Sequence, residues 1–410
     1  MFDFIGTWWW IILPVILFKP LRFYYQFWLR SRWDATQEKI VLEIKIPKEI
    51  LKPIKAMEYV MSGFHGIHDV PNFRERWLEG QFQLSISLEI VGISGQPHFF
   101  IRVPARFKRL VESNVYAQYP EAEISQMDDY TQDIPQDIPN HEWNLWGMDL
   151  KTSKDDHYPI KTYLKFETER ETKEEKRVDP LAGLLESMAS LHEGEQMWIQ
   201  IIVTPFIGEK KQWLEDGKKL IDKLVRRPTP QKARPIAQEA AEVLIFGPQT
   251  ISPVEKEIIP PEMKLTPGER EIVTAIEEKL GKFGFECNIR FAYVAKQDVF
   301  NPSAPIRMGM GFFRALSTQN LNGLRPMTET ITKIQWILRK RRVWLRKRRM
   351  FRYYQKRWSP FFPRLGGRFI LNTEELATLY HFPSRMVAPA PSILRVEAKK
   401  GEPPPGLPVE

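Results

Sequence analysis

The densest candidate chemistry in this sequence is a run of cations near its C-terminus. Residues 333–357 contain twelve lysines and arginines and no acid. The net charge of the whole chain is +9, so the rest carries −3 and the basic character is local. Apolar and aromatic residues, among them Trp336, Met350 and Trp358, recur between the cations at helical spacing. The pattern predicts a long basic helix within 327–360, packed along one stripe with its cations available.

Three interpretations fit a helix of this composition. Arginine and lysine neutralise the phosphates of nucleic acid, and aromatic rings stack on unpaired bases. The same mixture suits an anionic membrane leaflet, where cations reach the headgroups and aromatic rings lie at headgroup depth. The third interpretation is a partner's acidic groove or a solvated helix face. The candidate nucleic-acid or lipid-binding residues are Arg339, Lys340, Arg341, Arg342, Trp344, Arg346, Lys347, Arg348, Arg349, Arg352 and Trp358.

Signatures of catalysis are weak throughout the sequence. No G-x-x-x-x-G-K-[ST] phosphate loop is present, and Cys287 falls on the apolar face of a predicted strand. His65, His68 and Asp69 are close enough for a metal-dependent hydrolase, but no third distant ligand is indicated, and ordinary polar histidines at a helix end are favoured. We therefore predict a protein that is not an enzyme and has no catalytic residue, metal or cofactor.

Residues 1–33 predict a membrane anchor with a basic flank. From Phe2 to Phe18 the only charge is Asp3, and seventeen helical residues reach about 25 Å, just under a typical hydrocarbon core. The cations begin at Lys19, after the apolar run, whereas a secretory signal carries them in front. The positive-inside rule then predicts a single-pass protein of the cell membrane whose C-terminal bulk is cytoplasmic. The alternatives are a helix lying in the membrane plane and a helix packed into a soluble core.

The remaining sequence predicts an α+β protein with two ferredoxin-like domains. In 34–125, strand and helix periodicities follow the order strand, helix, strand, strand, helix, strand, and residues 82–90 alternate most clearly. Residues 126–160 are rich in acids and prolines and are interpreted as a linker. The second domain is assigned to 161–326, with residues 208–264 inserted between its halves. Its expected elements are a strand at 161–166, a helix after Asp179, a strand at 197–203, a capped helix from Thr266 and a strand at 287–293.

Residues 361–410 combine a short helix with a proline-rich tail. Phe369 to Ser384 reads FILNTEELATLYHFPS, in which Asn372 or Thr373 can cap a helix that Pro383 ends. This string resembles one in conjugative coupling proteins (TraG/TraD-like, type IV secretion) and HerA/FtsK-like ATPases. The anchor, the α/β region and the string together resemble the uncharacterised membrane-anchored N-terminal region of such proteins in candidate-phyla bacteria, without the motor domain.

The resemblance implies a non-enzymatic membrane component of a machine that translocates DNA or protein. It implies a separately encoded ring ATPase as partner, with DNA, anionic lipid and a second copy of the chain as further candidate partners. The alternative is a membrane-surface scaffold that binds anionic lipid and is unrelated to transport. The residues expected to dock the motor are Asn372, Thr373, Glu374, Glu375 and His381.

Overall fold

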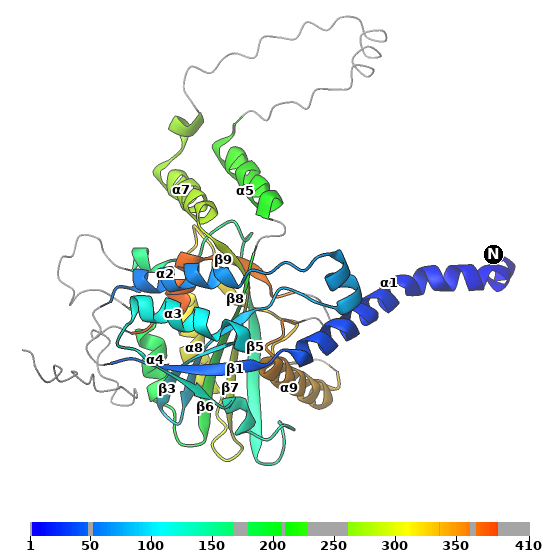
Figure 1. Ribbon diagram of the computed structural model, residues 1–410, viewed down its shortest axis with the longest axis horizontal. Helices are drawn as coiled ribbons and strands as arrows, with labels where there is room; N and C mark the ends of the chain where they lie inside the picture. Colours follow the sequence, from blue (N-terminus) through cyan, green and yellow to red (C-terminus); the bar gives the residue numbers. More distant parts are fainter. Residues whose placement is uncertain are drawn as a thin grey trace, which may run out of the picture.

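The computed structural model in Figure 1 is a mixed α+β fold built on one antiparallel sheet of nine strands. It describes residues 2–47, 52–166, 179–206, 210–227, 261–335, 337–360 and 366–383, although the side chains of 2–12 are not among them. The proline-rich tail, Trp336 and residues 228–260 of the predicted insertion lie outside the described residues.

The first four strands follow the predicted order of elements. They form the sheet order β4-β1-β3-β2, in which β1 lies between β3 and β4, as in the split βαβ arrangement. The alternation in β2 explains its two faces, because Leu88 and Ile90 pack under the helices while Glu89 points to the opposite face. The elements are β1 (Lys39–Lys45), α2 (Ile54–Phe64), β2 (Ile86–Ile93), β3 (Gln96–Pro104), α3 (Lys108–Gln118) and β4 (Glu123–Met127).

The second half repeats the same strand order, β8-β5-β7-β6, with an excursion between β6 and β7. Its first strand is β5, inside the predicted linker 126–160, and the strand predicted at 161–166 is a 3-10 turn, Tyr163–Lys165. The linker prediction is wrong for residues 143–152, which form a strand buried on both faces. Polar Asn144 and Asp149 interrupt the apolar pattern by which such a strand is recognised in a sequence. The elements are β5 (Trp143–Thr152), α4 (Ala182–Ala189), β6 (Glu195–Pro205), α5 (Lys210–Val225), α7 (Pro267–Gly281), β7 (Gly284–Lys296), α8 (Ser303–Ala315) and β8 (Leu324–Pro326).

The two halves share one sheet and one core, where the sequence predicted two domains. Strands β2 and β6 pair antiparallel along their whole length, from Ile86 opposite Val203 to Ile93 opposite Gln196. A single apolar cluster runs under α2, α3, α4 and α8 on one face of the sheet, here called the helix face. Pairing the edge strands β2 and β6 satisfies their backbone hydrogen-bonding groups and leaves no boundary between two domains. A ninth strand, β9 (Phe369–Asn372), pairs with the start of β7.

The opposite face of the sheet is covered by α9 (Arg339–Lys356) and by residues around Tyr130 and Ile138. The predicted basic helix is therefore real but shorter than 327–360. Leu338, immediately before it, has the left-handed φ of 56°, and the described residues between β8 and Leu338 form turns. Helices α5 and α7 pack on each other and project from the body (Figure 1).

Helix α1 (Phe2–Thr36) extends away from the body, and only its C-terminal third packs against it (Figure 1). It continues through Pro14 and Pro20 without a break. Among the residues described, no helix combines the length and apolar character required to cross a bilayer. The predicted transmembrane helix thus has no support from this part of the chain.

Candidate polyanion-binding helix and the buried network beneath it

Helix α9 has an exposed half and a buried half. In its second half, Met350, Phe351 and Tyr354 pack on the sheet with Trp198 of β6. The predicted stripe therefore anchors the helix at these positions. The predicted site residues that are exposed are Arg339, Lys340, Arg341, Arg342, Trp344 and Arg352. They form the candidate polyanion-binding surface, and they lie mostly in the first half of the helix.

The middle cations of α9 are engaged by the protein itself. Arg346 Nη1 donates to the carbonyl oxygens of Ile331 (2.7 Å) and Thr328 (3.2 Å). Lys347 Nζ donates to Asn144 Oδ1 at 2.6 Å, and burial lowers its pKa to about 8. Arg348 stacks over the Trp344 ring at 4.6 Å, and Arg349 is half-buried. These four residues are less available to a ligand than the sequence predicted.

Trp358 is committed to α1 instead of to a ligand. Its ring meets the ring of Phe27 edge-on, with centroids 5.7 Å apart, and Lys356 Nζ lies 4.4 Å from it. Its carbonyl oxygen accepts a hydrogen bond from Arg290 Nη2 at 2.9 Å. The contact joins the end of the basic helix to the helix that carries the apolar N-terminus.

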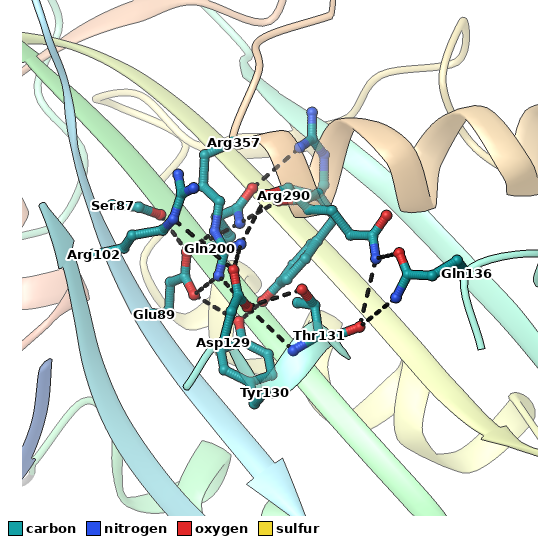
Figure 2. Close-up of polar contacts among 12 residues, drawn as sticks. Ser87, Glu89, Arg102, Asp129, Tyr130, Thr131, Gln136, Gln200, Arg290 and Arg357 are labelled. Carbon is teal, nitrogen blue, oxygen red and sulfur yellow. Dashed lines mark hydrogen bonds and ion pairs between the residues drawn. The ribbon is translucent and has the colours of Figure 1, made fainter. Parts of the chain in front are cut away.

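Arg357 ends α9 and enters the sheet, as Figure 2 shows. Its φ of 53° turns the chain, and its side chain is buried between two carboxylates. Arg357 Nε and Nη2 donate to the two oxygens of Glu89 at 2.8 and 3.0 Å, and Nη2 also donates to Asp129 Oδ1 at 3.0 Å. Tyr130 Oη donates to Glu89 Oε2 at 2.6 Å. Strand β2, the segment after β4 and the end of α9 are thereby held at one point.

A second buried ion pair lies beside the first and is bridged to it. Arg290 Nε of β7 donates to Asp149 Oδ1 of β5 at 2.9 Å, and both side chains are fully buried. Arg290 Nη1 donates to Gln200 Oε1 at 3.1 Å, and Gln200 Nε2 in turn donates to Glu89 Oε1 and to the carbonyl of Tyr354. Figure 2 shows Glu89, Gln200 and Arg290, which lie on the neighbouring strands β2, β6 and β7.

The electrostatics of the network are those of a structural clamp. Burial opposes ionisation of Glu89, but Arg357 and the hydrogen-bond donors outweigh it and hold the pKa of Glu89 below its usual value. Burial outweighs Arg290 at Asp149 and raises the pKa of that carboxyl, whose Oδ2 has no hydrogen-bond partner. The Arg290 guanidinium is occupied by carboxylate, amide and carbonyl oxygens, and that of Arg357 by two carboxylates and the Gln355 carbonyl. Sequence reasoning missed this cluster because Glu89 has the position of a solvated residue in an alternating strand.

The five residues predicted to dock a motor are buried within the chain. Glu375 of α10 (Thr373–Leu379) contacts Lys279 Nζ at 3.0 Å in an ion pair that is almost completely buried. Glu374 pairs with Lys282, and His381 Nε2 lies 2.9 Å from Asp179 Oδ1. Of the two predicted caps, Asn372 is the one used, in a capping box with Glu375, and Thr373 is buried beside them. The docking prediction is wrong for this helix, because its polar groups are used to attach α10 to α7 and the body.

The candidate metal residues also have ordinary structural roles. His65 packs on Phe283, with ring centroids 4.8 Å apart, and Asp69 pairs with Arg106 at 3.4 Å. Within the described ranges, no group of three or more histidine, cysteine or acidic side chains is placed to hold a metal ion. Cys287 is buried, and its pKa is raised well above the usual value by desolvation.

Comparison with known proteins identifies a family but no function. The comparison with curated proteins finds no match. The profile of a family described as "Domain of unknown function (DUF8128)" matches residues 30–391, which include the whole sheet, α9 and α10. The match covers well over half of the chain, and the chain therefore belongs to the DUF8128 family.

Proposed function

We propose that this protein is a non-enzymatic scaffold attached to a membrane by α1, with α9 contacting the anionic lipid headgroups. The observation that carries the proposal is the contact between Phe27 and Trp358, which joins these two helices. Helix α1, which carries the apolar N-terminus, and the basic helix α9 are more than 300 residues apart along the chain and touch where Phe27 meets Trp358.

Before Gln26, the described apolar side chains of α1 are not covered by the body. Every described residue from Leu13 to Tyr25 is exposed, including Val15, Ile16 and Leu21. Removing one such side chain from water contributes about 1.5–3 kcal/mol, so a bilayer offers α1 a large stabilisation that the body does not. The sequence extends the apolar run N-terminally to Phe4. Cations starting at Lys19 favour a cytoplasmic location for the body.

The exposed cations of α9 suit the same surface. Arg339, Lys340, Arg341 and Arg342 are consecutive and exposed, and each contributes about 1 kcal/mol near an anionic leaflet. Since α9 ends against α1, a membrane that receives α1 lies within reach of the basic helix. Lipid is therefore favoured over the other polyanions.

A second candidate is the nucleic-acid-contacting component of a translocating machine. Trp344 is exposed among the cations, and such a ring can stack on an unpaired base. The resemblance of residues 369–384 to the region preceding motor domains supports a ring ATPase partner. Because α10 is buried, that partner would have to bind elsewhere on the chain.

Membrane attachment is tested with the full chain in cells. The protein should resist carbonate extraction, and a C-terminal reporter should be cytoplasmic. Recovery of the protein in the soluble fraction would contradict attachment by α1.

Contact of α9 with headgroups is tested with an environment-sensitive fluorophore at Leu345→Cys, an exposed position of α9. In nanodiscs, the emission should shift to the blue with phosphatidylserine present and not with phosphatidylcholine alone, and salt should reverse the shift. The variant with Arg339, Lys340, Arg341 and Arg342 changed to Gln should lose the response. The matched control removes four exposed cations elsewhere, with Lys52, Lys55, Lys218 and Arg314 changed to Gln. A response to single-stranded DNA but not to phosphatidylserine would instead establish the second candidate.

A further inference from the structure

A second exposed apolar feature lies next to α1. Val70, Phe73 and Leu78 are 58%, 80% and 64% exposed, and we call them the apolar knob. Leu78 lies in a single π-helical turn, η2 (Glu75–Glu79), and Val70 and Phe73 precede it. The turn is locally ordered, because Glu75 N donates to Asn72 Oδ1 at 3.0 Å and Asn72 N donates to Glu75 Oε2 at 2.8 Å.

The knob is fixed to α1 by specific contacts. The guanidinium of Arg22 lies 4.5 Å over the Trp77 ring, and Gln26 Nε2 donates to the Trp77 carbonyl at 3.4 Å. The Phe73 ring packs on Trp77 with centroids 6.1 Å apart. Gly80 ends the turn with a φ of +76°, and a Cβ there would lie 2.5 Å from the backbone of Leu29. The position of the knob relative to α1 is therefore set by backbone as well as side-chain packing.

Helix α1 leaves the body between η2 and the end of α9 (Figure 1). The knob lies beside the exposed part of α1, because Arg22 and Gln26 of α1 hold the turn. The charges around the knob match a headgroup region: Arg74 pairs with Glu79 at 3.7 Å, Arg76 is exposed, and Glu75 is used by the local cap.

We propose that the apolar knob inserts into the same membrane leaflet that α1 enters. The inference rests on the proposed membrane attachment and adds a second apolar contact to it. The occupant is the lipid bilayer, because the knob is held beside the helix that enters the membrane and its neighbouring cations suit headgroups. Contacts through α1, the knob and α9 fix the orientation of the body, which a single flexible anchor does not.

The experiment uses the full chain in bilayers that contain spin-labelled lipid quenchers. A fluorophore is attached at Phe73→Cys or at Leu78→Cys, with Val70→Cys as a further variant. Leu21→Cys reports on α1. Tyr59→Cys, at an exposed position of α2, is the matched control away from the knob. The natural Cys287 is buried, so the unsubstituted protein should remain unlabelled.

We expect quenching at positions 73, 78 and 21, and none at 59. Quenching at 21 alone would overturn the insertion of the knob while leaving membrane attachment intact. Absence of quenching at all positions would overturn both. If the fluorophore emission at positions 73 and 78 shifts with protein concentration in detergent, without lipid, a second copy of the chain covers the knob. That result would also overturn the inference.

Discussion

Replacing Arg357 with Met tests the clamp beneath α9. The substitution keeps an unbranched apolar stem and removes the only guanidinium in contact with Glu89 among the described residues. Glu89 is fully buried and would lose its ion-pair partner, whereas Asp129, which is largely buried, would keep Arg102 at 3.9 Å. Breaking a buried pair in this way typically costs 3–5 kcal/mol, because a charge remains in the interior without compensation.

A matched change on the same helix separates the pair from general effects of charge. Arg352→Met removes an exposed cation five residues earlier, and a surface substitution of this kind should stay within about 0.5 kcal/mol. Adding Glu89→Gln to Arg357→Met removes the uncompensated charge, so the double variant should recover part of the loss.

The free energy of unfolding is measured by urea titration of the full chain in detergent, with near-UV circular dichroism as the probe of the tryptophans packed on α9. The reasoning is refuted if Arg357→Met is as mild as Arg352→Met. It is also refuted if the double variant is less stable than Arg357→Met alone, since the buried charge would then not be the source of the cost.

Three further predictions follow from the buried groups. In Arg357→Met, the loss of stability on acidification should be smaller than in the parent protein. In the parent fold, Glu89 and Asp129 have lowered pKa values, so their contribution to stability is present above the ordinary carboxyl pKa and is lost as the pH falls through the lowered pKa values of the folded state. Urea midpoints between about pH 7 and pH 3 measure this difference. Glu375→Ala should lower the free energy of unfolding by about 3–5 kcal/mol, since it leaves Lys279 buried without its carboxylate. Urea unfolding followed by far-UV circular dichroism measures this loss. Amine acylation of Lys347, followed by mass spectrometry, should show a titration midpoint near its pKa of about 8; a midpoint at the ordinary lysine value would contradict its burial.

Local periodicity predicted the first half of the fold because each element there has a clean pattern. Leu88 and Ile90 alternate with polar neighbours in β2, and Met57 and Met61 lie on one face of α2. The pairing of β2 with β6 could not be predicted in this way, since strands 110 residues apart carry no local signal of each other. The sequence therefore predicted the strands of the first half and β6 and β7 of the second, and missed β5, β8 and the single shared sheet.

Charged residues caused the main errors at the candidate sites. Asn372 was one of the two residues predicted to cap α10, and it does so. An acidic first helical turn is normally exposed, but here Glu375 pairs with Lys279, 96 residues earlier. Glu89 and Arg357 are likewise 268 residues apart. Single residues of this kind are interpreted as surface until a structure places their partners.

The division of α9 into a clamped half and an exposed half connects its stability to a ligand. Cations in the first turn oppose the helix dipole, and like charges four residues apart, as at Arg342 and Arg346, cost about 0.2–0.5 kcal/mol per pair. The exposed half is thus helical against its local preferences and depends on the packing of Tyr354 and the Arg357 clamp. An anionic surface removes both penalties at once, since it neutralises the cations and lies at the positive end of the dipole. Binding of anionic lipid should therefore stabilise the first turns of α9 more than its already packed end.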